Sequence, residues 1–175
     1  MRFTLVDRIV LLEPGAKITT VKTLSLAEEY LADHFPRFPV MPGVLMLEAM
    51  TQASAWLIRV SEDFAHSIVT LQQARNLRFR NFVAPGQVLT VSAEIVKHGE
   101  RETQLEVQGK LSDSIAVSGR LVLERSNLAD RRPDLAPTDE YIKRSMKGLL
   151  AILYGPSAAN LQNQNGSEPL AGLEA

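Results

Sequence analysis

The stretch from Val44 to Val60 constrains the fold more than any other part of the chain, because twelve of its 17 residues are apolar. A helix that is apolar around most of its circumference must be buried on most sides. A membrane-spanning helix needs about 20 largely uncharged residues, and this stretch is too short and too polar for that. Its exceptions gather on one stripe around Glu48, which at about 100° per residue includes Thr51, Gln52, Ala55 and Arg59. The sequence therefore predicts a buried central helix with a carboxylate on one stripe.

The segment directly before this helix is a stiff loop. Residues 34–43 read HFPRFPVMPG, with prolines at three of seven consecutive positions. Proline fixes its own backbone and biases the preceding residue toward extended geometry, which forbids a regular helix or a central strand here. Pro42 suits a first-turn position, and we expect the helix to run from Gly43 onward.

The remaining apolar residues mostly recur with a period of two. Residues 8–24 read as a hairpin around Pro14–Gly15, and residues 68–124 read as four further strands joined by turns. Ser25 to Tyr30 reads as a short helical turn capped by Ser25. One buried helix with about six antiparallel strands predicts an α+β domain over residues 1–125, the sheet wrapping the helix.

Beyond this domain the composition changes. Residues 126–155 read as a charged linker followed by an amphipathic helix over residues 138–154, with Thr138 as its cap. Residues 156–175 are rich in Asn, Gln, Ser and Ala, and we expect a flexible tail. The chain has no cysteine, which excludes a disulfide framework or a thiolate metal site, and its net charge of −1 argues against nucleic-acid binding. Without a segment resembling a signal peptide or a membrane span, we expect a soluble, cytoplasmic protein.

Three residues near the start of the central helix could carry chemistry. His34 opens the stiff loop, Gly43 begins the helix, and Glu48 lies in its second turn. The first N–H groups of a helix have no intrahelical acceptor, and glycine lets a ligand approach them closely. An imidazole and a carboxylate nearby could move protons while the helix N-terminus holds an oxygen that gains negative charge. Both side chains could instead be purely structural, His34 bonded to backbone and Glu48 satisfied by neighbours such as Gln52.

The run from His34 to Gln52, HFPRFPVMPGVLMLEAMTQ, resembles the signature of the β-hydroxyacyl-acyl-carrier-protein dehydratases of the FabZ type. The resemblance extends upstream to Leu5–Arg8 and Glu13–Gly15, and downstream to Arg78–Arg80 and Val83–Gly86. It implies a hot-dog fold, in which a curled antiparallel sheet of about six strands wraps one long central helix, and here a C-terminal helical extension would be added.

The resemblance also implies roles for individual residues. His34 would take the C2 proton of a (3R)-hydroxyacyl thioester, and Glu48 would assist loss of the 3-hydroxyl to give a trans-2-enoyl thioester. The backbone N–H of Gly43 would contact the thioester carbonyl, and Gln52 would orient Glu48. His34 and Glu48 would come from different subunits of a homodimer or a trimer of dimers, with no cofactor and no metal. The implied apolar substrate tunnel includes Phe35, Phe38, Val40, Met41 and Pro42.

The chain departs from the family pattern in the same loop. Arg37 stands where the family usually has glycine, and Phe38 follows where a short or polar residue is usual. If the family's glycine has a positive φ at this position, the backbone of Arg37 would be strained in the same conformation. A further departure follows the strand predicted at about residues 69–80, where this chain has Asn81–Val83 and the family has Arg-Pro-Val.

Other candidates are weaker. Arg75, Arg78, Arg80 and Lys97 could form a basic patch for an acidic carrier protein, or could be solvated strand-end charges. We expect His66 and His98 to be ordinary surface residues and Trp56 to be a core residue. The leading hypothesis is a 3-hydroxyacyl thioester dehydratase of fatty-acid or related acyl-chain synthesis, acting on a carrier-protein-bound or coenzyme A-bound substrate. The alternatives are a hot-dog thioesterase and a non-catalytic hot-dog subunit that binds acyl chains.

Overall fold

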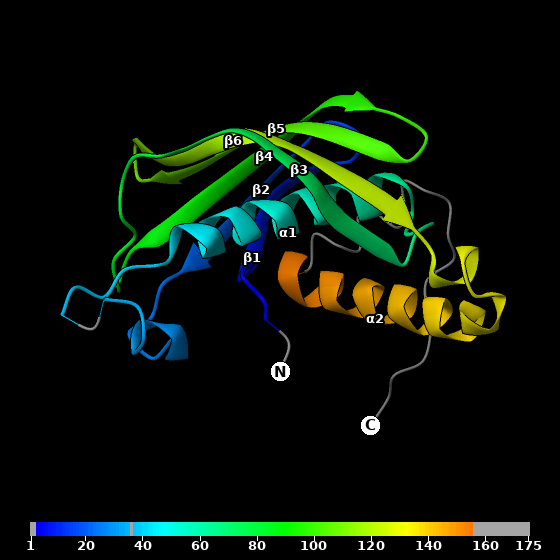
Figure 1. Ribbon diagram of the computed structural model, residues 1–175, viewed down its shortest axis with the longest axis horizontal. Coiled ribbons are helices and arrows are strands. Elements are labelled where there is room, and N and C mark those ends of the chain that lie inside the picture. Colours follow the sequence, from blue (N-terminus) through cyan, green and yellow to red (C-terminus); the bar gives the residue numbers. More distant parts are fainter. Residues whose placement is uncertain (1–2, 36, 156–175) are drawn as a thin grey trace.

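A computed structural model describes residues 3–35 and 37–155, and the predicted flexible tail, residues 156–175, lies outside this range. These residues form one sheet, two long helices and short 3-10 helices (Figure 1). In chain order they are β1 (Arg8–Glu13), β2 (Lys17–Thr23), a 3-10 helix (Glu29–Leu31), α1 (Gly43–Ser61), β3 (Ile68–Phe79), β4 (Val88–His98), β5 (Glu102–Leu111), β6 (Ser114–Ser126), two more 3-10 helices (Leu128–Asp130 and Pro133–Leu135), and α2 (Ala136–Tyr154).

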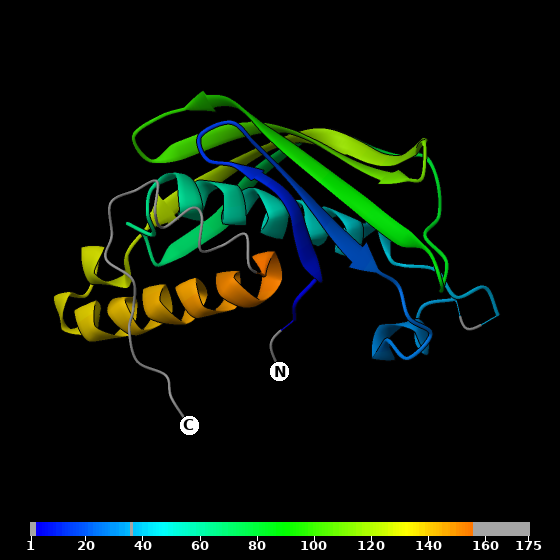
Figure 2. The same cartoon turned by 180° about the vertical axis from the view of Figure 1, so that it is seen from behind.

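The six strands form one antiparallel sheet in the order β1-β2-β4-β5-β6-β3. Figures 1 and 2 show that this sheet curls over α1, as the period-two pattern and the hot-dog resemblance predict. In β4 and β5 the alternate residues that face α1 are buried, namely Leu89, Val91, Ala93, Leu105 and Val107. The outward residues between them are polar, so the sheet has one core face and one exposed face.

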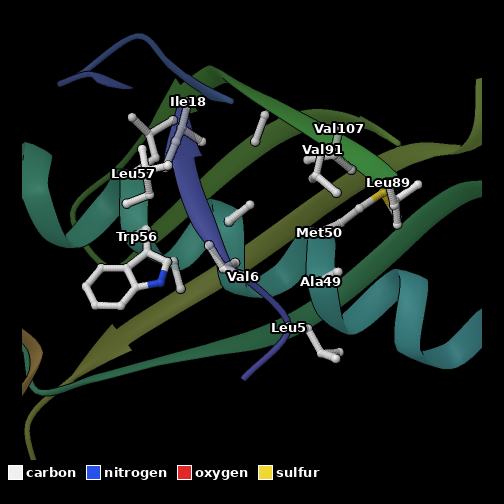
Figure 3. Packing of buried hydrophobic residues seen from close by; sticks show 14 of the residues in the cluster. Leu5, Val6, Ile18, Ala49, Met50, Trp56, Leu57, Leu89, Val91 and Val107 are labelled. Atoms are coloured by element: carbon white, nitrogen blue, oxygen red, sulfur yellow. The ribbon is translucent and has the colours of Figure 1, made fainter. Parts of the chain in front are cut away.

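Buried side chains from α1 fill the space under the sheet (Figure 3). Met50 and Leu57 are completely buried, and Trp56 is a core residue, as the sequence predicts. Arg59 follows one turn later on the polar stripe of α1, with its guanidinium 5.7 Å from the centroid of the Trp56 ring. Burial lowers the pKa of Arg59 to about 10, which leaves the group charged at neutral pH.

The extension lies along the C-terminal half of α1, on the side that faces away from the sheet. In both views α1 lies between the sheet and α2 (Figures 1 and 2). Leu150 and Leu153 of α2 are buried and belong to the same core as the residues of α1. Over the C-terminal half of α1, this third layer explains how a helix that is apolar around most of its circumference is buried on two opposite sides.

A polar cluster closes the C-terminal end of α1 and includes His66 and His98, whose side chains are 30% and 40% exposed, in keeping with their predicted surface positions. Glu62, which caps α1, accepts contacts from both rings, at 3.0 Å from Nδ1 of His66 and 3.1 Å from Nε2 of His98. Nη1 of Arg125 is 3.0 Å from the same carboxylate and 2.5 Å from the hydroxyl of Thr103. The sequence could not predict the cluster because its members come from α1, from the β4–β5 hairpin and from the end of β6.

Two predicted helix caps are wrong. The helical turn predicted at residues 25–30 begins later, as a 3-10 helix at Glu29–Leu31 with Glu28 as its N-cap. Ser25 lies in a separate turn before it, where its hydroxyl accepts the N–H of Ala27 and its carbonyl accepts the N–H of Glu28. Helix α2 begins at Ala136, so Thr138 lies inside it and not at its cap. Proline is tolerated in a first turn, which lets Pro137 stand there. Among the described residues no helix is long and apolar enough to cross a membrane.

Candidate active site

Two loops meet beside the start of α1. One, residues 32–42, joins the first 3-10 helix to α1 and carries His34; the other, residues 80–87, follows β3. The N–H of Met41 donates a hydrogen bond of 2.8 Å to the carbonyl of Val83 and so ties the loops together. Both residues are buried, at 1 % and 0 % exposed. The proline-rich loop is therefore anchored, at its C-terminal end, to the loop that follows β3.

These loops and the first turn of α1 enclose a mainly apolar cavity of about 330 Å³. His34 lines it beside Phe35, and the centroids of the two rings are 4.5 Å apart. Of the predicted tunnel residues, Phe35, Val40 and Met41 line the cavity, whereas Phe38 and Pro42 lie outside the lining. The complete lining is His34, Phe35, Val40, Met41, Gly43, Met46, Phe79, Arg80, Asn81 and Phe82.

Gly43 lies where the cavity meets the N-terminus of α1. Helix α1 begins at Gly43, as predicted. Pro42 has an extended backbone and is the N-cap of this helix, one position before the predicted first-turn position. A Cβ on Gly43 would approach the Phe79 ring to 3.2 Å, so the packing of β3 against α1 favours glycine here. The unpaired N–H groups and the positive end of the helix dipole make this a place to hold an oxygen that becomes negative.

Glu48 is held by Gln52, one turn further along α1. The Gln52 amide nitrogen donates a hydrogen bond of 2.9 Å to Oε1 of Glu48. The same nitrogen donates to the carbonyl of Phe3, and the amide oxygen accepts the N–H of Leu5 at 2.8 Å. Because both ends of the amide are bonded to the N-terminal segment, Gln52 has one orientation and Glu48 receives a fixed donor.

Within one chain, Glu48 does not line the cavity that contains His34. At 100° per residue, Glu48 lies about 140° around the helix from Gly43 and about 160° from Met46. Both of those residues face the cavity, so the carboxylate points to another side of α1. One chain alone therefore supplies the imidazole and the helix N-terminus to this cavity, but not the carboxylate.

Among the described residues of the loop, backbone strain falls on Phe35, which has φ of 50°. A left-handed conformation costs an L residue about 1–2 kcal/mol. The ring of Phe35 packs against the ring of His34 with an interplanar angle of 59°. The strained residue is therefore the direct neighbour of His34 in both sequence and space.

Residues 1–125 match the FabA-like domain family. The chain belongs to this family. It is 37% identical over 119 residues to the 3-hydroxyacyl-acyl-carrier-protein dehydratase FabZ of Ruminiclostridium cellulolyticum. The aligned residues cover 68% of this chain and 84% of the relative. It is 44% identical over 98 residues to the FabZ dehydratase of Myxococcus xanthus, covering 55% of this chain and 64% of that one.

Solved structures agree on the fold. The dehydratase heterocomplex ApeI:P from Xenorhabdus doucetiae has a TM-score of 0.62 at 19% identity, covering 76% of this chain and 90% of that one. The smu.793 protein of Streptococcus mutans, bound to acetyl CoA, has a TM-score of 0.56 at 13% identity, covering 72% and 93%. These structures share the hot-dog arrangement with the FabA-like domain described above, and α2 lies outside the residues that match the family.

The structure divides the predicted basic patch. Arg78 and Arg80 line a polar hollow of about 540 Å³ on the outer face of the sheet, which Arg120, Glu94 and Glu106 also line. Arg75 is exposed on the same strand, β3, and bonds to Gln73. Lys97 lies at the opposite end of the sheet, beside the β4–β5 turn, and does not join them, because β3 and β4 carry these residues at opposite ends.

Sequence reasoning missed four residues that line the cavity. Met46, Phe79, Asn81 and Phe82 come from α1, from β3 and from the loop that follows it. The departure from the family pattern at Asn81–Val83 was the available signal. It did not reveal that this loop faces His34, since that depends on how β3 pairs with β6.

Proposed function

We propose that this protein is a (3R)-hydroxyacyl-acyl-carrier-protein dehydratase, a hydro-lyase of fatty-acid or related acyl-chain synthesis. The observation that carries the proposal is the shared cavity of His34 and the Gly43 helix N-terminus. FabZ relatives at moderate identity over most of the domain support the same activity. The cytoplasmic location stays a prediction from the sequence.

The proposed reaction removes water across C2 and C3 of the acyl group. His34 takes the proton from C2 as general base, while the N–H of Gly43 binds the thioester oxygen as it gains negative charge. The C3–O bond breaks, Glu48 gives a proton to the leaving hydroxyl, and water departs. The electron pair of the C2–H bond forms the double bond of the trans-2-enoyl thioester. No step of this scheme requires a metal or an organic cofactor.

The active unit would be a homodimer, because Glu48 of the same chain faces away from the His34 cavity. Strand β3 favours such an assembly: it is an edge of the sheet and, among the described residues, pairs only with β6. An unpaired strand edge is a template for pairing with another chain. A second copy paired there could present its Glu48 to this cavity, with Gln52 holding the carboxylate in place.

The carrier protein would dock near Arg80. This arginine lines both the His34 cavity and the outer hollow that contains Arg78, so it connects the reaction site to the basic part of the sheet surface. An acidic carrier would be attracted to this side, and exposed charge pairs mainly raise the rate of association. Lys97 is excluded from this proposed surface by its position.

Complementation between two inactive variants tests the shared site most directly. His34→Ala and Glu48→Gln proteins are purified separately, unfolded together and refolded, and hydration of crotonyl thioester is followed by the loss of enoyl absorbance. Each mixed dimer has one site with both groups intact, so random pairing should restore about a quarter of the wild-type activity. Each variant refolded alone is the control.

The other results separate the alternatives. Activity in wild type without complementation would place both groups in one chain and reject the shared site. No dehydration or hydration by a folded wild-type dimer, on any enoyl thioester, would reject the enzyme and favour a non-catalytic acyl-binding subunit. Hydrolysis of a saturated acyl thioester that depends on Glu48 would instead identify a thioesterase.

A further inference from the structure

Two exposed phenylalanines meet at the cavity that contains His34. Phe38 is 57% exposed and Phe82 is 64% exposed, although they come from different loops. Their rings pack edge to face, with centroids 5.5 Å apart and an interplanar angle of 88°. Phe82 lines the cavity, and Phe38 contacts the ring of Phe82 from outside the lining.

The backbone on both sides of Phe82 is anchored. The backbone N–H of Asn81 donates a hydrogen bond of 3.3 Å to the carbonyl of Ala116, and its side-chain amide donates one of 3.1 Å to the carbonyl of Ile115. On the other side, the carbonyl of Val83 accepts the N–H of Met41. Phe38 is fixed as well, because its N–H donates a bond of 2.7 Å to the carbonyl of Phe35. The contact between the two rings is therefore a built feature of the loops, made from two anchored backbones.

We propose that Phe82 is the wall that limits the size of the acyl group and that Phe38 is a positioning residue that holds this ring in place. The inference rests on the proposed function and adds its substrate class, thioesters of short acyl groups. The part of the cavity that one chain lines supports this class, since its volume of about 330 Å³ lies near the lower end of the roughly 300–1,000 Å³ usual for small-molecule sites.

The ring of Phe82 excludes bulk by occupying space at the cavity wall. Edge-to-face packing is a preferred geometry for two aromatic rings, so Phe38 favours one orientation of Phe82 over others. Without Phe38 the exposed ring can turn toward solvent and widen the cavity. Loss of either ring should therefore change substrate preference in the same direction, and loss of both should add little to loss of Phe82 alone.

The test compares kcat/KM for crotonyl and trans-2-dodecenoyl thioesters in wild type, Phe82→Ala, Phe38→Ala and the double variant. Pocket contacts of a methylene or more are worth about tenfold or above in specificity, so Phe82→Ala should raise the dodecenoyl-to-crotonyl ratio at least tenfold. Phe38→Ala should raise it by a smaller factor. Phe38→Tyr keeps the ring and should retain the wild-type ratio.

Tyr141→Ala is the matched control, because Tyr141 is equally exposed, at 64%, but lies on α2 away from the cavity. A second readout, calorimetric affinity for butyryl and dodecanoyl thioesters, does not need turnover. If wild type turns over no enoyl thioester but Phe82→Ala shifts the affinity ratio, the proposed function fails while the wall stands. Unchanged ratios in Phe82→Ala, or no binding of either saturated thioester by any of these proteins, would overturn the inference.

Discussion

The two ends of α1 differ in how far the groups around them are buried and bonded to one another. At the N-terminal end the cavity is open, and the rings of Phe38 and Phe82 stand largely in solvent. At the C-terminal end Arg125 is 2% exposed and bonds to Glu62, to Thr103 and to the carbonyl of Gly99. One helix thus begins at exposed aromatic surface and ends in a buried ionic cluster.

This difference separates function from stability along one helix. Exposed apolar rings and unpaired helix N–H groups contribute little to the stability of the isolated chain, so they are available to a substrate or a partner. A buried charge cluster is bound by its own partners and can change only at a large cost. We therefore expect substitutions at the open end to change catalysis with little effect on unfolding, and substitutions at the closed end to do the reverse.

The largest expected effect is at the open end. His34→Ala should lower kcat by about 10²–10⁴-fold, because loss of a general base removes a contribution of that size. Within the part of the chain that the structure describes, the half-buried ring makes no hydrogen bond that ties it to the core, so the thermal midpoint should stay close to wild type. Crotonyl thioester hydration measures the first and calorimetry the second. A variant that loses activity by unfolding would contradict the proposed division between the two ends.

At the closed end, Arg125→Met should lower the free energy of unfolding by about 3 kcal/mol, because it leaves Glu62 without its buried cation. The activity of the folded fraction should remain near that of wild type. Urea unfolding measures the change in the free energy of unfolding.

Arg120→Met is the control for this change, because Arg120 is also on β6 but is exposed and 3.9 Å from its carboxylate partner, Glu106. Surface substitutions of this kind usually change stability by less than about 0.5 kcal/mol. Equal effects of the two variants would show that the buried cluster does not stabilise this end.

Helix α2 extends the closed end, and Leu150→Ala tests how much it contributes. Leu150 is buried in the common core, so truncation should cost about 2–4 kcal/mol through lost burial and a cavity. Ile152→Ala, at an exposed position two residues later, should cost less than about 0.5 kcal/mol. Denaturant unfolding distinguishes them. If Leu150→Ala were as mild as Ile152→Ala, α2 would not be a third layer over α1.

The smallest expected effect concerns Asp139, which fixes the start of α2. Burial by itself would raise the pKa of this carboxyl, but hydrogen bonds from Ser67, Ala129 and Leu128, with the charge of Lys143, lower it overall. Because the pKa of the Asp139 carboxyl is lower in the folded than in the unfolded protein, the folded state binds fewer protons at pH values between these two pKa values. Its contribution to stability is complete above about pH 4 and is lost as the pH falls through the folded pKa.

Asp139→Asn should therefore be less stable than wild type at pH 7, and the difference should shrink as the pH falls below about 4. Thermal midpoints measured across this range give the result. Asp134→Asn is the control, because Asp134 is exposed and pairs with Arg132 in the neighbouring 3-10 helix. A difference between Asp139→Asn and wild type that stayed constant with pH would show that the carboxylate charge contributes nothing.

Much of the fold follows from local pattern. The apolar stretch after Pro42 gives the buried α1, and alternation over residues 68–124 gives β3 to β6. The proline-rich loop, the glycine at the helix start and the nearby His34 could all be recognised because their meaning depends on neighbours in sequence. The predicted cap at Thr138 was wrong because α2 follows directly on the 3-10 helix at Pro133–Leu135, with Leu135 as its N-cap.

The sequence by itself determined a helix that had to be buried, a sheet with one apolar face, and a histidine and a glycine close to one helix end. Only the tertiary structure decided which distant residues meet them. It brings Phe82 to Phe38, brings Arg125 to Glu62, and turns Glu48 away from His34. The physical reason is that periodicity encodes which face of an element is buried, whereas strand register and loop packing choose the neighbour on that face.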